Sequence, residues 1–235
     1  MYYVIQDGDY PYKLAQRFNV PVQDILDANP GIDPNNLAIG TRILIPVISS
    51  LSAHTLADSV HDLWNQNLNA TVSLIENSVK HTSNQQETLN NLYENANGFG
   101  NLFRIFYGNE IGDQINRMFD EQILTRLQLI DATIEQNDTA IRVVESRWFN
   151  NVELFVEFLN QLNPNWQQTE LGRMLVDYLN SLKELIAVEI QNNSQRIEET
   201  INALQAQANV IADYMIDGFI KDFMLQERMA DMWMY

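Results

Sequence analysis

The spacing of apolar and polar residues along this 235-residue chain changes after about residue 52. Before that point there is a short alternating stretch, then two short segments with helical spacing, then a second alternating stretch that ends at Pro46. Alternation predicts strands, whereas apolar residues three or four positions apart predict amphipathic helices. The first fifty residues are therefore expected to form a small α+β unit in the order strand, helix, helix, strand.

Turn residues mark the boundaries of this unit. Asp7-Gly8-Asp9 follows the first strand, and Pro11 suits the first turn of a helix, because an N–H at that position has no helical partner anyway. Asn29-Pro30-Gly31 ends the second helix. The returning strand at 43–45 is expected to pair antiparallel with residues 4–5 and to cover both helices, since two strands alone are marginally stable.

The stretch YVIQDGDYPYKLAQRFNVPVQDILDANPGIDPNNLAIGTRILIP, residues 3–46, resembles a LysM domain. The resemblance implies binding of N-acetylglucosamine polymers, chiefly peptidoglycan and chitin, in a shallow groove between the loop after the first strand and the loop after the second helix. The groove residues it implies here are Gly8, Asp9, Tyr10, Pro11, Asn29, Pro30, Gly31 and Ile32. Tyr10 replaces the threonine usual in the family, which would either add stacking area or block the groove.

The chemistry of these residues suits an acetamido sugar. Backbone N–H and C=O groups at a bend pair with the acetamido group, while Tyr10, Pro30 and Ile32 offer apolar contact to the sugar face and the methyl group. The alternative is a module that keeps the fold and has weak or no glycan affinity.

From Ala53 onward, apolar residues recur at three- and four-residue steps, and only one more proline, Pro164, occurs. The pattern predicts helices at 53–80, 84–94, 110–136, 138–162, 169–191 and 194–223, with Asp138 as an N-cap. Gly98 and Gly100 are expected to interrupt the second helix, and 102–107 to form an apolar connection. We expect an antiparallel bundle of four or five long helices.

These boundaries divide the chain into a LysM-like module (1–47), a linker (48–52), a helical bundle (53–223) and a tail (224–235). The tail is rich in methionine and aromatic residues, which are common at adaptable contact surfaces. It is expected either to fold back on the bundle or to contact another subunit. Its candidate assembly residues are Met229, Met232, Trp233 and Tyr235.

The net charge of −17 belongs mainly to the helical part. Residues 1–46 carry 3 basic and 5 acidic side chains, so the remainder carries 11 and 26, or −15. Such a surface argues against nucleic acid and anionic membranes as partners, because both are polyanions. The chain has no cysteine and no apolar run long enough to span a membrane.

Segments 102–108, 147–151, 163–166 and 218–223 resemble an uncharacterised all-helical family of spore-forming Firmicutes, of the ferritin-like, four-helix-bundle type. The resemblance implies a metal site with one histidine on each of three helices. The corresponding residues here are Asn67, Gln122 and Tyr178, so the metal histidines are lost. We therefore expect no bound transition metal, and interpret these three as hydrogen-bonded core residues that fix the helix register.

No catalytic constellation is evident in the sequence. His54, His61 and His81 fall near the two ends of one predicted helix and are interpreted as surface residues. Phosphate loops, nucleophile elbows and zinc motifs do not occur, so we expect neither an enzyme nor a cofactor.

These observations favour a non-enzymatic structural protein of the bacterial cell or spore envelope. The module would bind peptidoglycan, and the acidic bundle would mediate assembly with itself or with envelope proteins. Without a signal peptide, synthesis is expected in the cytoplasm, followed by deposition on the spore coat or cortex or the cell envelope. The alternatives are a component of a contractile injection or phage-tail-like particle, and a degenerate ferritin-like bundle that binds metal or another ligand.

Overall fold

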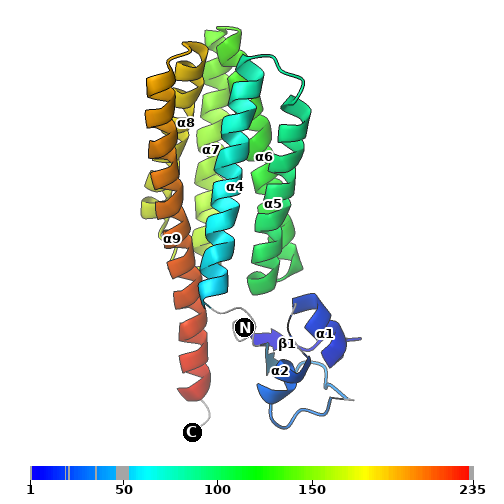
Figure 1. Ribbon diagram of the computed structural model, residues 1–235. Coiled ribbons are helices and arrows are strands. Elements are labelled where there is room, and N and C mark those ends of the chain that lie inside the picture. The colour runs from blue at the N-terminus through cyan, green and yellow to red at the C-terminus, as the bar shows by residue number, and fades with distance from the viewer. Residues whose placement is uncertain (1, 19, 21, 35, 46–52, 233–235) are drawn as a thin grey trace.

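The computed structural model describes residues 2–18, 20, 22–34, 36–45 and 53–232, with side chains in the helical part from 55 to 222. A small N-terminal module lies at one end of a long helical bundle (Figure 1). The module contains β1 (Tyr2–Val4), α1 (Pro11–Phe18), α2 (Val22–Asp27) and β2 (Arg42–Leu44). This order confirms the one predicted from the sequence.

The two strands of the module form an antiparallel pair in which Tyr3 lies opposite Ile43 and Val4 opposite Arg42. Their inward side chains cover both short helices. The module has a small core of its own: Tyr3, Ile5, Leu14, Ala15, Phe18, Val20, Ile25, Ile43 and Ile45. Ile105, from the bundle, packs against this core as well as against the core of the bundle, and therefore joins the two parts.

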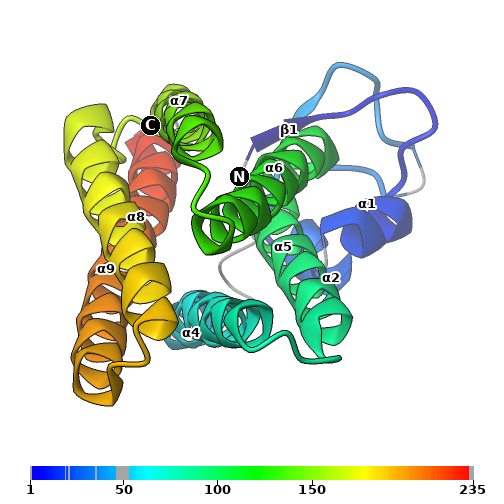
Figure 2. The same cartoon turned by 90° about the horizontal axis from the view of Figure 1, so that it is seen from above.

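The helical part contains six long helices within the described residues, which corrects the expected four or five. They are α4 (Ala53–Val79), α5 (Gln85–Tyr107), α6 (Asn109–Ile134), α7 (Asp138–Leu162), α8 (Gln168–Ile190) and α9 (Ser194–Met232). Each packs against the next, and α9 packs against α4, so the bundle closes on itself (Figure 2). The helices α4, α6 and α8 also contact one another. These three therefore meet inside the bundle.

The predicted break in the second helix was wrong. Gly98 and Gly100 lie inside α5, which runs without interruption to Tyr107. A Cβ at Gly98 would come within 2.6 Å of Leu63 Cδ2, and one at Gly100 within 2.9 Å of the Gly112 carbonyl oxygen. Both glycines permit close helix packing, which offsets their poor intrinsic helix propensity. The predicted connection at 102–107 is the end of α5.

Two helix ends also differ from the prediction. Asn137, rather than Asp138, caps α7, and its Oδ1 accepts a hydrogen bond from the Ala140 N–H at 3.1 Å. Asp138 is the first helical residue, where a carboxylate is favourable to the helix dipole. At the other end of the chain, α9 continues past the expected limit at Phe223 to Met232.

The predicted assembly tail is described only in part. Met229 and Met232 lie on the last turns of α9, but their side chains are outside the described residues, as are Trp233 and Tyr235 altogether. The helix shows no reversal at the start of the tail (Figure 1). The described tail backbone therefore extends α9.

Candidate functional site

The loop after β1, one of the two loops that the sequence singles out, is anchored by backbone contacts at one end of the strand pair. The loop after β1 and the segment before β2 are joined by two backbone hydrogen bonds, from Ile5 N to Thr41 O and from Gly40 N to Ile5 O, both 2.8 Å. These bonds continue the strand pair beyond Val4 and Arg42. The backbone around the first loop is therefore held firmly.

Asp9 stabilises the first loop through hydrogen bonds to its carboxylate. Its carboxylate accepts hydrogen bonds from the Tyr3 hydroxyl at 2.7 Å and from the Gln6 N–H at 2.8 Å. Burial and the Asp9 carboxylate raise the pKa of the Tyr3 phenol, and Arg17, which donates to the phenol oxygen at 2.9 Å, opposes that shift. The Asp9 carboxylate is thus engaged in folding the turn.

Asn29 holds the second loop in the same way, through hydrogen bonds from its side chain to the backbone. Its amide accepts from the Leu44 N–H at 2.7 Å and donates to the Leu44 carbonyl at 2.6 Å and the Ile25 carbonyl at 2.7 Å. The Asn29 side chain therefore bonds the backbone of β2 at Leu44 and the backbone of α2 at Ile25, and it joins the two elements. The Asn29 amide thus has a structural role in the loop, and its predicted place in the glycan groove stays a prediction.

The remaining positions of the two loops divide into buried and exposed ones. Pro11 is buried at the start of α1, and Gly8 (φ 78°) and Gly31 (φ 112°) adopt the left-handed conformation that favours glycine. Pro30 is exposed, and Ile32 is half-buried against the module core.

Tyr10 projects into solvent with 52% of its surface exposed. The phenol is therefore available for stacking on a sugar ring. Sequence reasoning missed three further exposed apolar side chains in the module, Val4 (51%), Tyr12 (58%) and Ile39 (67%). An aromatic residue on the polar side of α1 was the available signal for Tyr12, because that side otherwise carries Lys13, Gln16 and Arg17.

Residues 3–46 form a LysM domain. A 55-residue stretch is 42% identical to part of a Bacillus subtilis (strain 168) protein named as a sporulation-specific glycosylase, YdhD. That match covers 23% of this chain and 13% of YdhD, so the greater part of both proteins lies outside it. No solved structure shows a significant match to the chain.

Inside the bundle, the predicted polar residues behave differently from one another. Asn67 is buried and donates to Asn95 Oδ1 at 2.8 Å, and Asn95 donates to the Leu63 carbonyl at 2.9 Å. Tyr178 is buried, yet its hydroxyl has no protein hydrogen-bond partner, which corrects the expectation of a bonded residue. Gln122 is only half-buried. The three do not form one hydrogen-bonded set.

A buried cation, Arg126, lies beside two of these residues. Its Nη1 donates to Thr71 Oγ1 at 2.5 Å, and the Thr71 hydroxyl donates to the Asn67 carbonyl at 2.7 Å. Burial raises the pKa of Tyr178 to about 12, and the nearby charge of Arg126 acts against that rise. The sequence pattern does not predict the burial of Arg126, because arginines on amphipathic helices are mostly exposed.

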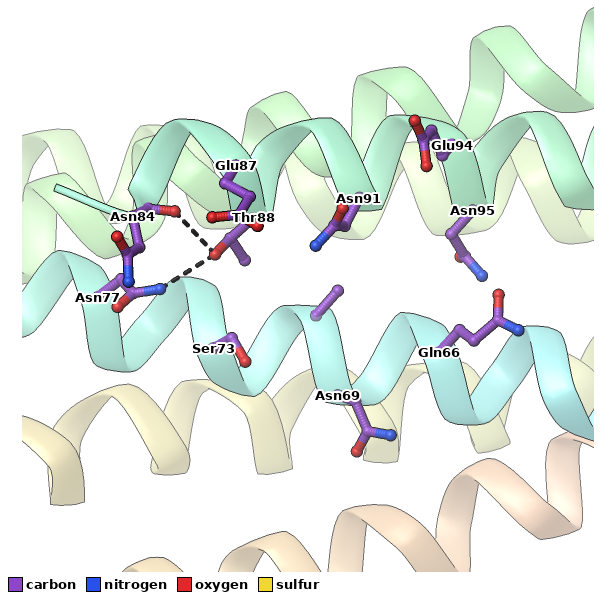
Figure 3. A pocket seen from close by; sticks show the side chains of 11 residues that line it. Gln66, Asn69, Ser73, Asn77, Asn84, Glu87, Thr88, Asn91, Glu94 and Asn95 are labelled. Atoms are coloured by element: carbon purple, nitrogen blue, oxygen red, sulfur yellow. Dashed lines mark hydrogen bonds between the residues drawn. The ribbon is translucent and has the colours of Figure 1, made fainter. Parts of the chain in front are cut away.

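A polar groove of about 730 Å³ runs between α4 and α5 (Figure 3). Asn77 donates to the Thr88 hydroxyl, which donates to the Asn84 carbonyl, both at 3.0 Å. The groove is lined mostly by amides, with two carboxylates: Gln66, Asn69, Asn77, Asn84, Asn91, Asn95, Glu87 and Glu94. Such a surface suits uncharged polar groups better than anions.

The structure places the other candidate residues apart from these features. The His61 imidazole lies 3.0 Å from an Asp213 carboxylate oxygen, and His81 is exposed in a turn, while the His54 side chain is not described. Among the described residues, no group of three or more His, Cys, Asp or Glu side chains is arranged to hold a metal ion. No helix in the described ranges is both long and apolar enough to cross a lipid bilayer.

Proposed function

We propose that the protein is a non-enzymatic structural component of the bacterial cell or spore envelope. Its LysM domain binds peptidoglycan or a related polymer of N-acetylglucosamine, and its acidic helical bundle is held at that polymer to mediate assembly. The part shared with YdhD lends support to a sporulation setting, because the name of that protein connects it to sporulation.

The observation that carries the proposal is that the polar and the apolar side chains of the two loops have different roles. The side chains of Asp9 and Asn29 form hydrogen bonds within the module. The apolar side chains of the loops keep at least part of their surface exposed to solvent: Tyr10, Pro30 and Ile32. Rigid loops with exposed apolar surface and backbone polar groups suit an acetamido sugar, since preorganisation reduces the entropic cost of binding.

The assembly role is supported by the face of the bundle formed by α6 and α7. A groove of about 450 Å³ on this face is lined by Met118 and Leu154 together with polar residues, and the Leu154 side chain is 50% exposed. Leu124, on the same pair of helices, is also exposed. Exposed apolar side chains on neighbouring helices are a common feature of protein contact surfaces.

The glycan part of the proposal is tested by binding of the full chain to purified peptidoglycan and to soluble N-acetylglucosamine oligomers. We expect Tyr10→Ala to weaken binding about tenfold, which corresponds to the loss of one stacked ring. Tyr93→Ala is the matched control, because Tyr93 is an exposed tyrosine on α5 of the bundle. It should bind as the unmodified protein does.

Equal affinity of the unmodified protein, Tyr10→Ala and Tyr93→Ala would remove Tyr10 from the site. Absence of any saturable binding by the unmodified protein would overturn the proposal itself. Release of soluble sugar fragments from peptidoglycan by the purified protein would contradict the non-enzymatic role.

A further inference from the structure

Arg126 is a positive charge enclosed by the bundle. Its side chain is on α6, one of the three helices that meet in the interior, and the residue is only 4% exposed. Burial lowers the pKa of the guanidinium, but arginine starts from so high a value that it stays charged at neutral pH. A buried charge of this kind requires compensation, because removing an ion from water costs several kcal/mol.

The protein supplies little of that compensation. Thr71 Oγ1 accepts one hydrogen bond from Nη1, but Nε has no hydrogen-bond partner, and no ion pair within the described part of the chain involves Arg126. Tyr178 interacts with Arg126 electrostatically, yet its pKa of about 12 keeps the phenol neutral at physiological pH. It therefore cannot act as the counter-ion.

The neighbouring groups add more donors. The Tyr178 hydroxyl has no partner, and the Trp64 ring packs edge-to-face on Tyr178 with centroids 5.9 Å apart. The indole N–H of Trp64 also lacks a partner, and Trp64 lies two turns from Thr71 on the buried face of α4. Three buried donors on α4, α6 and α8 thus lack acceptors, and Tyr178 links the other two through its ring contact with Trp64 and its electrostatic interaction with Arg126.

We propose that Arg126, Tyr178 and Trp64 form an internal site for one small monovalent anion, of the chloride class. One formal positive charge balances one negative charge, which favours a monovalent anion over phosphate or sulfate. Arg126 Nε and the Tyr178 hydroxyl donate to the ion, and the Trp64 indole completes the enclosure. Hydrogen bonds connect this layer to the α4–α5 groove: Asn95 lines the groove (Figure 3) and accepts from Asn67, whose carbonyl accepts from the Thr71 hydroxyl.

The test uses the full chain in sodium chloride, in sodium bromide and in sodium gluconate, whose anion is too bulky for the site, at equal ionic strength. Chloride and bromide should raise the melting temperature saturably, by about 3–6 °C at roughly tenfold above Kd. Bromide should also quench tryptophan fluorescence with the same midpoint. In bromide-soaked crystals, an anomalous peak should appear within hydrogen-bonding distance of Arg126 Nε.

Arg126→Met preserves length and apolar packing and should abolish both responses, while Arg117→Met, an exposed arginine on the same helix, should keep them. Tyr178→Phe retains the ring and should weaken bromide binding about three- to tenfold, which provides a test even if Arg126→Met does not fold. Coincident curves in chloride and gluconate for the unmodified protein, an unchanged response in Arg126→Met, or unchanged affinity in Tyr178→Phe would each overturn the proposal.

Discussion

Trp166 packs directly on the backbone of α9 at Gly218. The indole Nε1 donates to the Met215 carbonyl at 3.1 Å, and Asn163, from the same loop, donates to the Gly218 carbonyl at 3.0 Å. A Cβ at Gly218 would overlap the indole ring. The α7–α8 loop is therefore held against α9 at Gly218, because only a residue without a Cβ leaves room for the indole ring.

Gly218→Ala should destabilise the bundle by about 3 kcal/mol, because the indole must move and lose its packing and its hydrogen bond. Urea unfolding followed by circular dichroism measures the change. Gly172→Ala on α8 is the matched control, since a Cβ there meets Val156 at an ordinary 3.9 Å. That substitution should be neutral or stabilising by up to about 1 kcal/mol. Equal effects of both substitutions would contradict the packing argument.

Asn29→Ala should destabilise the LysM domain by about 2–4 kcal/mol, because it leaves the Leu44 N–H and carbonyl without their partner. Hydrogen exchange of the β1 and β2 amides in the full chain reports this directly. Asn36→Ala, at an exposed position in the same loop, should leave exchange unchanged. Tyr10→Ala should also leave it unchanged while it weakens glycan binding, which separates the structural role of Asn29 from the contact surface.

Three carboxyl groups with raised pKa values should make the protein gain stability as the pH falls from neutral toward about 4, where such groups titrate in an unfolded chain. Burial raises the pKa values of Asp120, Asp131 and Glu189, so the folded state binds protons more tightly than the unfolded state. These groups therefore contribute stability below their folded pKa values, and that contribution is lost as the pH rises through them. Calorimetry at both pH values tests the sign.

Asp131→Asn should raise the melting temperature near pH 7 and should reduce the pH dependence. Asp62→Asn, an exposed carboxylate on α4, controls for the general loss of one negative charge. A melting temperature that falls steadily from neutral pH to about pH 4 would show that other groups dominate.

Association through the α6–α7 face should strengthen as salt is added. The net charge of −17 opposes self-association at low ionic strength, and salt screens that repulsion over about 10 Å at 0.1 M. Light scattering coupled to size-exclusion chromatography should show a higher mass at high salt. Leu154→Glu should abolish the increase, whereas Val210→Glu on α9, also an exposed apolar position, should not. A strict monomer under all conditions would refute assembly through this face.

The elements followed from the sequence where local rules were enough. The sequence predicts Asn67 in the helical core, and Asn67 is buried together with Trp64 and Thr71, because a helix fixes which residues share a face. The LysM frame was equally accessible, since its turn residues and strand alternation lie close together along the chain. The sequence alone does not separate Asp138 from Asn137 as the cap of α7, because both are good capping residues and only the backbone geometry distinguishes them.

Tertiary packing decided the rest. Gly100 predicts a break when read locally, but it lies inside a helix because Gly112 on α6 approaches too closely for a side chain. Arg126 has an ordinary place in an amphipathic helix, and its burial follows from the meeting of α4, α6 and α8. Sequence spacing determines which face a residue shares, whereas the space and the partners opposite that face depend on segments distant in the chain.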